Sequence, residues 1–383
     1  MRYNLVFVET EKGINNFFFL SDLNSTFEIN PVFEKIIKFY NPYVVVRKEL
    51  VFKLKKFTNN VYDTFKVDRE TFVFDSLFIP YKIPNLKRET LLHYNGKVVG
   101  IFIKNGIIKA PFRFESSENL DVKEIEGVYI ENFFDLPSLV LNLVEALLRF
   151  DNGYKKVDKN IFVKGKVRLK HFFFDTSDGP IVIEKLGEVL PPVTLKGPLF
   201  IGTEVNLYRT FIKNSFIKDV VKVGGEVDST IFYGYSNKAH EGYVGNSVIG
   251  KWVNLGALTT TSDLKNTYSQ VRIHIENEKV IDTGKIKVGV FISDHVQTGI
   301  GTLLSTGTVV MPFVNLYGGL SFKGLIGPFT WWGDDVKTEY KLEKAIEVAK
   351  KMMERRNVKM EDEYVELIRS FYNKFKNRKS AEM

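Results

Sequence analysis

The feature that most constrains this chain is a period of six in the apolar residues of its third quarter. One ladder consists of Val193, Leu199, Val205, Phe211 and Ile217, and a second, two residues out of phase, of Leu195, Ile201 and Leu207. The period returns at Ile286, Ile292, Thr298, Leu304 and Val310. A strand has a period of two and a helix one of 3.6, so neither explains it. A coil of three short strands with a corner every six residues does, which predicts a parallel β-helix.

Glycines support this interpretation, because several follow an apolar residue where a corner is expected. They are Gly202, Gly224, Gly245, Gly250 and Gly256. Glycine tolerates sharp corners that a side chain would obstruct. Each coil of such a solenoid buries only its inward residues, so neighbouring coils complete the core. The alternative is a β-sandwich in which the spacing is coincidental.

Residues 1–155 are predicted to form one α/β domain. The expected strands are Asn4–Val8, Tyr43–Val46, Thr71–Phe74 and Val98–Ile103, and the expected helices are Pro31–Tyr40 and Leu136–Phe150. Strands that alternate with helices favour a mostly parallel, layered sheet. Residues 156–180 are interpreted as a connector to the solenoid.

The β-helix is expected over residues 181–327, with an excursion at 259–284. Within the excursion, two alternating segments predict a hairpin around Glu276 and Asn277. A long loop on a rigid scaffold is a common place for a functional site. Residues 328–383 form the last region, helical from about Val336, with two apolar stripes. We expect this helical pair to cap the open end of the solenoid.

Composition limits the class of protein. The chain has 383 residues, no cysteine and a net charge of +8. The missing cysteines exclude disulfides, thiolate zinc sites and a cysteine nucleophile. The positive charge is spread along the chain and suits anionic small substrates as well as it suits nucleic acid. No apolar run has the length of a membrane span and no signal-peptide pattern begins the sequence, so we expect a cytoplasmic protein without a membrane partner. We expect a small-molecule substrate and no nucleic-acid partner.

The segment from Tyr235 to Gly245 is dense in polar and small residues and interrupts the six-residue ladder just before Val244. A solenoid does not need such a cluster to fold. An imidazole titrates near neutral pH and can act as a general base, which makes His240 a candidate. The alternative is that His240 is an ordinary surface or hydrogen-bonded residue.

Four motifs in this region carry a family resemblance: GYSNKAH at 234–240, YVGNSVIG at 243–250, WVNLG at 252–256 and TTSDLKN at 260–266. They resemble the acyltransferase domain of the bifunctional N-acetylglucosamine-1-phosphate uridylyltransferase/glucosamine-1-phosphate acetyltransferases. The match is closer to a variant bacterial branch of sugar nucleotidyltransferases. The segment DHVQTGIGT at 294–302 and the tail from Trp332 also resemble that branch. The similarity runs from about residue 1 to about 375, strongest over 224–310 and weak before 130.

The resemblance implies a left-handed β-helix, a homotrimer with sites between subunits, and an N-terminal Rossmann-like nucleotidyltransferase domain. The family's His–x–x–Tyr pair and the asparagine on the next coil fall on His240, Tyr243 and Asn254. His240 would be the base that takes a proton from a sugar amine. Tyr243 and Asn254 would orient the sugar or the intermediate.

The resemblance also implies binding residues. Substrate contacts are expected from Lys238, Asp263, Lys265 and Arg209. Acetyl coenzyme A contacts are expected from Gly256, Ala257, Asp294, His295 and Thr298, with backbone N–H groups at Gly256 and Ala257 as oxyanion donors. His295 has a structural alternative, the capping of a turn.

The chain departs from the family at several positions. Ser229 and Thr230 stand where the family has a basic residue for the sugar phosphate, and Arg209 or Lys213 could replace it. Leu258 replaces a usual glycine and could narrow the path of the pantetheine arm. Thr261 replaces an asparagine of the variant branch.

The N-terminal domain departs further. Where the uridylyltransferases have a Gly-rich phosphate loop with an arginine, residues 9–15 contain one glycine and two acids, which repel phosphates. The strand that starts at Thr71 resembles the family strand that ends in a magnesium-binding aspartate, so Asp75 is a candidate Mg²⁺ ligand. A polar strand end is the structural alternative. Asp135 and Asn142 are further candidate ligands.

Together these features predict an enzyme of sugar-nucleotide metabolism, as in UDP-N-acetylglucosamine biosynthesis. The β-helix would transfer an acyl group from acyl coenzyme A to an amino-sugar phosphate or a nucleotide sugar. The N-terminal domain would add sugar-1-phosphate nucleotidyl transfer from a nucleoside triphosphate. One alternative is that only the N-terminal domain is catalytic and the β-helix is a trimerising, regulatory scaffold. Another is a non-catalytic sugar-nucleotide-binding scaffold.

Overall fold

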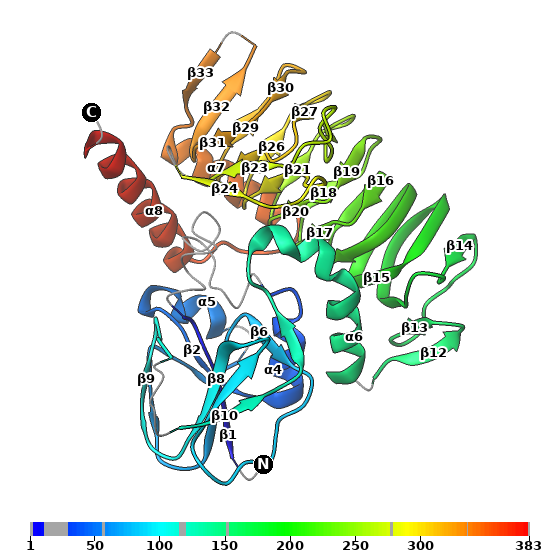
Figure 1. The fold of residues 1–383 in the computed structure, drawn as a ribbon. Coiled ribbons are helices and arrows are strands. Elements are labelled where there is room, and N and C mark those ends of the chain that lie inside the picture. The colour runs from blue at the N-terminus through cyan, green and yellow to red at the C-terminus, as the bar shows by residue number, and fades with distance from the viewer. Residues whose placement is uncertain are drawn as a thin grey trace. The chain divides into compact units, whose positions relative to one another are not determined.

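The computed structural model describes residues 3–10, 30–55, 58–114, 120–150, 153–275, 279–334 and 336–381. The chain divides into two compact units (Figure 1). The N-terminal unit consists of Met1–Phe133 and Glu145–Asn152, and the β-helix unit of Phe134–Val144 and Gly153–Met383. None of the helices in the described ranges is both long and apolar enough to cross a membrane.

The N-terminal unit is built on a mixed sheet with the strand order β10-β7-β8-β5-β1-β2-β3. Strands β3, β2, β1 and β5 run parallel, β10 runs parallel to β7, and β8 is antiparallel to both of its neighbours. These strands are β1 (Asn4–Val8), β2 (Tyr43–Val45), β3 (Val61–Tyr62), β5 (Thr71–Asp75), β7 (Thr90–Tyr94), β8 (Lys97–Ile103) and β10 (Asp121–Glu124). The strands expected from the sequence are found here, while the Rossmann-like assignment stays a prediction.

Shorter elements complete this part of the chain. Helix α4 (Phe33–Tyr40) lies between the parallel strands β1 and β2, where a helix was predicted. The 3₁₀ helix η1 (Lys48–Leu50) leads into α5 (Val51–Lys55). Two antiparallel pairs are β4 (Thr64–Val67) with β9 (Gly106–Lys109), and β6 (Phe78–Pro80) with β11 (Gly127–Tyr129). The helix predicted for 136–150 begins as the 3₁₀ helix η2 (Phe133–Leu139), which contains Pro137, and continues as α6 (Val140–Phe150).

The β-helix predicted from the six-residue period is present. Strand β15 (Ile181–Ile217) runs through more than one coil, because successive parts of it pair in parallel with β13, β14, β16 and β17. Each later coil consists of about three sides of six residues. Gln297 therefore pairs with Asn315, which occupies the same position on the next coil. Their parallel strands are β16 (Lys222–Asp228), β17 (Ile231–Phe232), β18 (Asn237–Lys238), β19 (Tyr243–Gly245), β20 (Val248–Ile249), β21 (Asn254–Leu255), β22 (Thr260–Thr261), β25 (Phe291–Ile292), β26 (Gln297–Thr298), β27 (Leu303–Leu304), β28 (Val309–Val310), β29 (Asn315–Leu316), β30 (Ser321–Phe322), β31 (Leu325–Ile326) and β32 (Thr330–Gly333).

The apolar ladders form the core of the solenoid, with two exceptions. Val193, Leu199 and Val205 are fully buried. Phe211 is only half-buried, and its neighbour Ile212 enters the core instead, because the pairing of β15 with β16 shifts between Tyr208 and Thr210. Ile286 is 50% exposed, because it precedes the point at which the chain rejoins the coils at β25.

The predicted corner glycines have a different role from the one expected. None of the five has a positive φ; the left-handed corners are occupied by larger residues such as Trp252, Leu258 and His295. At four of the five, all but Gly245, an adjacent coil lies too close for a side chain. A Cβ at Gly224 would lie 2.2 Å from the carbonyl oxygen of Ala239, and one at Gly256 would lie 2.6 Å from that of Gly299.

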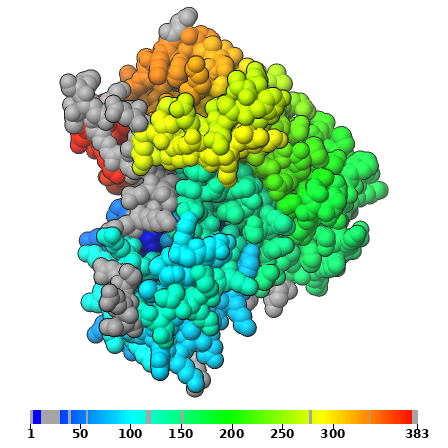
Figure 2. Space-filling model, viewed as in Figure 1, coloured from blue at the N-terminus to red at the C-terminus, as the bar shows by residue number. Residues whose placement is uncertain are grey.

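Two predicted boundaries differ from the structure. Residues 156–180, interpreted as a connector, contain β12 (Lys155–Asp158), β13 (Ile161–Val163) and β14 (Phe172–Asp175), and the last two pair with β15. The excursion expected from residue 259 starts after Thr261, since β22 still pairs with β27. The hairpin inside the excursion is β23 (Arg272–His274) with β24 (Val280–Asp282). Glu276 and Asn277 lie outside the described residues. In Figure 2 the excursion lies within the surface coloured yellow.

The C-terminal helices were predicted to cap the open end of the solenoid, but they pack along its side. The segment at Val336–Glu339 is a strand, β33, antiparallel to β32. Helix α7 (Leu342–Glu354) lies beside the column of strands β16, β18, β21 and β26, and α8 (Asp362–Ala381) packs against a column of aromatic corner residues. Both helices therefore cover a flank of the β-helix along several coils (Figure 1).

Candidate active site

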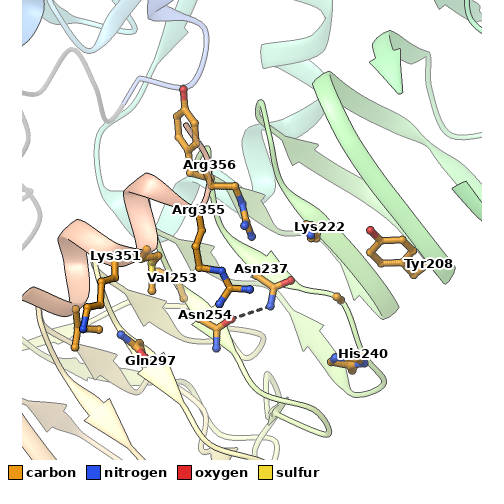
Figure 3. Close-up of a pocket in the computed structure, with 14 residues that line it drawn as sticks. Tyr208, Lys222, Asn237, His240, Val253, Asn254, Gln297, Lys351, Arg355 and Arg356 are labelled. Atoms are coloured by element: carbon orange, nitrogen blue, oxygen red, sulfur yellow. Dashed lines mark hydrogen bonds between the residues drawn. The ribbon is translucent and has the colours of Figure 1, made fainter. Parts of the chain in front are cut away.

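A cavity of about 420 Å³ lies between α7 and one flank of the β-helix (Figure 3). Its floor is a column of side chains at matching positions in successive coils, because Lys222 pairs with Asn237, Asn237 with Asn254, and Asn254 with Gln297. Helix α7 and the turn after it supply the opposite wall. The lining residues are Tyr208, Lys222, Tyr235, Asn237, Ala239, His240, Val253, Asn254, Gln297, Val348, Lys351, Met352, Arg355 and Arg356.

His240 and Asn254, two of the three residues implied by the family motif, line this cavity together. His240 is exposed and lies in the turn that follows β18. Asn254 is half-buried in β21, and its Oδ1 accepts a hydrogen bond of 2.7 Å from Asn237 Nδ2. This bond leaves the Nδ2 group of Asn254 as the part of the amide that can meet a ligand. An imidazole and an amide hydrogen-bond donor thus share one cavity.

Tyr243, the third residue, does not line the cavity. It lies in β19, on the side of the coil beyond the His240 turn, and its hydroxyl donates to Asp263 Oδ2 at 3.1 Å. Asn246 Nδ2 donates to the same oxygen at 2.6 Å. Burial, and then the negative charges of Asp263, Asp228 and Glu226, raise the pKa of Tyr243. Tyr243 and Asp263 therefore form a hydrogen-bonded cluster of their own, with Tyr243 as a neutral phenol.

Lys238 was predicted to bind substrate, and the structure places it inside the solenoid. Its side chain is 1% exposed and pairs in register with the core residue Val223. Its ammonium donates to the carbonyl oxygens of Gly224, at 3.2 Å, and of His240. Burial lowers the pKa of Lys238 to about 8, although the nearby Glu241 acts in the opposite direction. Lys238 cannot reach the cavity, and it ties down the turn that carries His240.

Most residues predicted to contact coenzyme A form hydrogen bonds or ring contacts with other residues of the chain. Asp294 is buried and accepts the N–H of Lys251 at 2.8 Å. His295 is 3% exposed, stacks on Phe313 with ring centroids 4.8 Å apart, and its Nε2 lies 3.0 Å from the hydroxyl of Tyr364 on α8. These contacts bury the His295 ring within the fold, and its contact with coenzyme A stays a prediction.

One of the two predicted oxyanion donors, the N–H of Gly256, is likewise engaged within the fold. The N–H of Gly256 donates to the carbonyl oxygen of Thr298 at 3.1 Å and to its hydroxyl at 3.0 Å. Thr298 is itself buried and bonded to Thr259 at 2.7 Å. The carbonyl oxygen of Ala257 accepts the N–H of Gly301 at 2.8 Å. The N–H of Gly256 is therefore not available to an oxyanion.

The remaining predicted substrate residues lie away from the cavity. Arg209 is exposed at a left-handed corner of β15, and Lys213 is paired with Asp228 at 3.1 Å. Lys265 donates to the carbonyl oxygen of Gln270 at 2.7 Å, within the excursion. None of these three cations is part of the cavity lining.

The cations that do line the cavity come from positions that the sequence did not single out. Lys222 lies in β16, Lys351 in α7, and Arg355 and Arg356 in the turn after α7. Lys351 is paired with Glu347 at 2.6 Å. Burial and the charge of Arg356 lower the pKa of Lys222, and burial and the charge of Arg355 lower the pKa of Arg356. The only signal in the sequence was two adjacent arginines after an apolar helical stripe.

In the N-terminal unit, the predicted magnesium site is not supported by the residues described. Asp75 ends β5 as expected, but it is 3% exposed. It accepts hydrogen bonds from the hydroxyls of Thr10 and Tyr129 and from the N–H of Leu77. The candidate Asp135 belongs to the other unit and is paired with Lys285 at 2.6 Å. Across the described residues, no three His, Asp or Glu side chains are grouped to hold a metal ion.

Residues 9–15, which replace the family's Gly-rich phosphate loop, are described only at Glu9 and Thr10, because residues 11–15 lie outside the described ranges. Glu9, one of the two acids noted there, is fully buried. Its carboxylate is paired with Arg47 at 3.1 Å and accepts the N–H of Arg47 at 3.0 Å. Glu9 is therefore held within the fold.

No protein-family model matches the chain. The chain is 28% identical over 164 residues to the bifunctional sugar-1-phosphate nucleotidylyltransferase/acetyltransferase of Sulfurisphaera tokodaii, a match that covers 37% of this chain and 41% of that protein. It is also 28% identical over 193 residues to the bifunctional protein GlmU of Methanocaldococcus jannaschii, covering 49% and 44%. The chain is a relative of these GlmU-like proteins. The resemblance predicted from its motifs is thereby confirmed, over less than half the length of either relative.

Solved structures show weaker similarity. The N-acyltransferase AntD from Bacillus cereus, in complex with dTDP-4-amino-4,6-dideoxyglucose and coenzyme A, is 14% identical, with 51% of this chain and 89% of that chain covered and a TM-score of 0.26. AntD in complex with dTDP and 3-hydroxybutyryl-CoA is 15% identical, with 54% and 93% covered and a TM-score of 0.25. At these values we draw no inference from either structure.

Proposed function

We propose that the protein is a transferase that moves an acyl group from acyl coenzyme A to the amine of a phosphorylated amino sugar, in the cavity beneath α7. The observation that carries this proposal is that His240 and Asn254 line one cavity with four basic side chains. The Sulfurisphaera tokodaii relative, whose name includes acetyltransferase, supports the same chemistry. The cations suit an anionic sugar derivative.

The reaction joins the amine nitrogen to the acyl carbon and breaks the bond from that carbon to sulfur. His240 takes the proton that the amine loses as it attacks, and returns a proton to the departing thiolate of coenzyme A. The Nδ2 group of Asn254 can donate a hydrogen bond to the sugar or to the developing oxyanion. Lys238 acts indirectly, because its bond to the carbonyl of His240 positions the turn.

The test is the release of coenzyme A from acetyl coenzyme A in the presence of a panel of amino-sugar phosphates and nucleotide amino sugars, read by mass spectrometry. His240→Ala should lower turnover about 10²–10⁴-fold, because general-base catalysis contributes that much. His274→Ala is the matched control, because His274 is an exposed histidine on β23 of the same unit. Full turnover by the His240→Ala protein would show that His240 is not the general base.

Nucleotidyl transfer by the N-terminal unit stays a prediction from the resemblance. The hydrogen-bonded state of Asp75 does not fit a Mg²⁺ ligand, so we derive no metal-dependent step. Pyrophosphate formation from a nucleoside triphosphate and a sugar phosphate, in the same assay panel, would restore that activity. Binding of a nucleotide sugar without any product would favour the non-catalytic scaffold.

The left-handed sense of the coil and the homotrimer also remain part of the proposal. Two apolar corner residues of neighbouring coils support an assembly surface: Leu258 is 55% exposed and Ile300 71% exposed. Their coils are joined by the bond from the N–H of Gly301 to the carbonyl of Ala257. Exposed apolar pairs are typical of surfaces that a partner covers. Sedimentation of the full chain measures the oligomeric state directly.

A further inference from the structure

Three cations belong to two cavities at once. Lys222, Arg355 and Arg356 line the cavity that contains His240, and they also line a second cavity of about 350 Å³. The second cavity extends along earlier coils to Lys185, Glu204 and Asn206. The two cavities therefore adjoin each other at these three cations. Figure 3 shows the two arginines projecting from the helix side toward the strand that carries Lys222.

Within the described part of the chain, no acidic side chain forms an ion pair with these three cations. The acid whose charge acts on Lys222 is Glu188, which accepts a hydrogen bond from Tyr208 at 2.9 Å. Glu204 is paired with Lys185 at 2.8 Å. Arg356 Nε is buried and has no hydrogen-bond partner among the described residues. Buried polar groups are normally satisfied, so this atom indicates a ligand that is not part of the chain.

A structural explanation accounts for only part of this cluster. Basic residues near a helix C-terminus are favoured by the helix dipole, which would explain arginines after α7. The dipole does not explain why Lys222, from the β-helix, lies in the same cluster. Burial and mutual repulsion lower the pKa values of Lys222 and Arg356, and an anion between them would relieve that repulsion.

We propose that Lys222, Arg355 and Arg356 bind the diphosphate of a nucleoside-diphosphate amino sugar, whose sugar points toward His240 and whose nucleoside occupies the second cavity. Arginine forks bind phosphate oxygens in pairs, which suits a diphosphate better than a single lysine would. The carboxylate of Glu204 in the second cavity can accept hydrogen bonds from ribose hydroxyls. An amino-sugar monophosphate would leave that cavity unused. The assignment of the reacting sugar rests on the proposed function, whereas the assignment of the diphosphate site rests on the positions of the three cations.

The test is calorimetric titration of the full chain with phosphate, inorganic pyrophosphate, ADP, GDP and UDP. Pyrophosphate should bind more tightly than phosphate, and at least one nucleoside diphosphate more tightly than pyrophosphate. Arg356→Gln and Lys222→Gln should each weaken nucleotide binding about tenfold or more, because each removes a charge-assisted bond to phosphate. Arg356→Lys should recover part of the affinity because it keeps the charge. Arg272→Gln is the control, since Arg272 is exposed on β23.

Separate outcomes bear on the diphosphate site and on the acyl transfer. His240→Ala should bind the nucleoside diphosphate like the parent protein, so a failure of the catalytic assignment leaves the diphosphate site standing. Equal affinity for phosphate and every nucleoside diphosphate would overturn the inference, as would unchanged binding in a folded Arg356→Gln, Lys222→Gln double variant. The melting temperature of each variant verifies that it is folded.

Discussion

The two C-terminal helices pack on the same solenoid in opposite ways. Beneath α8 lies a column of buried rings in which Trp252, His295, Phe313 and Phe329 follow one another in successive coils, with His295 bonded to Tyr364. Beneath α7 lies a column of amides and cations that encloses a cavity. The α8 contact buries aromatic rings and stabilises the fold, while the α7 contact leaves polar groups exposed to a ligand. The difference separates a structural histidine, His295, from a candidate catalytic one, His240.

The largest effect on stability is expected from His295→Ala. Its ring is 3% exposed and stacked, so truncation should lower the free energy of unfolding by about 3 kcal/mol, as for other large buried side chains. Nucleotide binding by the folded fraction should be unchanged. Urea denaturation measures the loss, with His274→Ala as a control that should change stability by less than about 0.5 kcal/mol. A stable His295→Ala protein that no longer uses acyl coenzyme A would show that His295 contributes to cofactor binding and not to stability.

The next effect concerns Lys238 and pH. Because burial lowers the pKa of Lys238 to about 8 in the folded protein, the unfolded chain holds more protons between pH 8 and about 10.4. Stability should therefore rise with pH across that window, by up to about 3 kcal/mol from this group. Lys238→Met should remove this rise, and Lys265→Met should not. Identical pH profiles for the parent and Lys238→Met would contradict the burial of a charged ammonium.

The smallest effect is expected from Tyr243→Phe. The substitution removes one hydrogen bond to Asp263, which keeps its bond from Asn246, so stability should fall by about 1 kcal/mol. Turnover should change little, because Tyr243 does not line the cavity. Steady-state kinetics checks this, with Tyr268→Phe as a control at a site 70% exposed. A hundredfold loss of turnover would mean that Tyr243 meets the substrate in the assembled protein.

The solenoid could be predicted from sequence because its inward positions repeat at a fixed spacing. The prediction was wrong at Phe211, since a local shift in pairing has no signature in the period. The burial of His295 could not be predicted because residues that cover it come from α8, far along the chain. The burial of Lys238 could not be predicted because a lysine in a polar motif resembles a surface residue, although its register position faces the core.

The candidate site was predictable only in part. His240 and Asn254 come from neighbouring coils, so the repeat itself brings them near each other. The arginines come from the turn after α7, more than one hundred residues from His240 along the chain. The apolar stripe of α7 showed that the helix packs against the protein but not which flank it covers. Only the folded structure brings Arg355 and Arg356 to the cavity.

The most direct measurement compares two acceptors for acetyl coenzyme A: an amino-sugar 1-phosphate and the nucleoside-diphosphate form of the same amino sugar. Mass spectrometry would quantify the acetylated product for the parent protein, His240→Ala and Arg356→Gln. We predict that the nucleotide sugar is acetylated faster, that His240→Ala lowers product formation about 10²–10⁴-fold, and that Arg356→Gln raises the KM for the nucleotide sugar. Equal rates for both acceptors, or product from His240→Ala at the parental rate, would contradict this prediction.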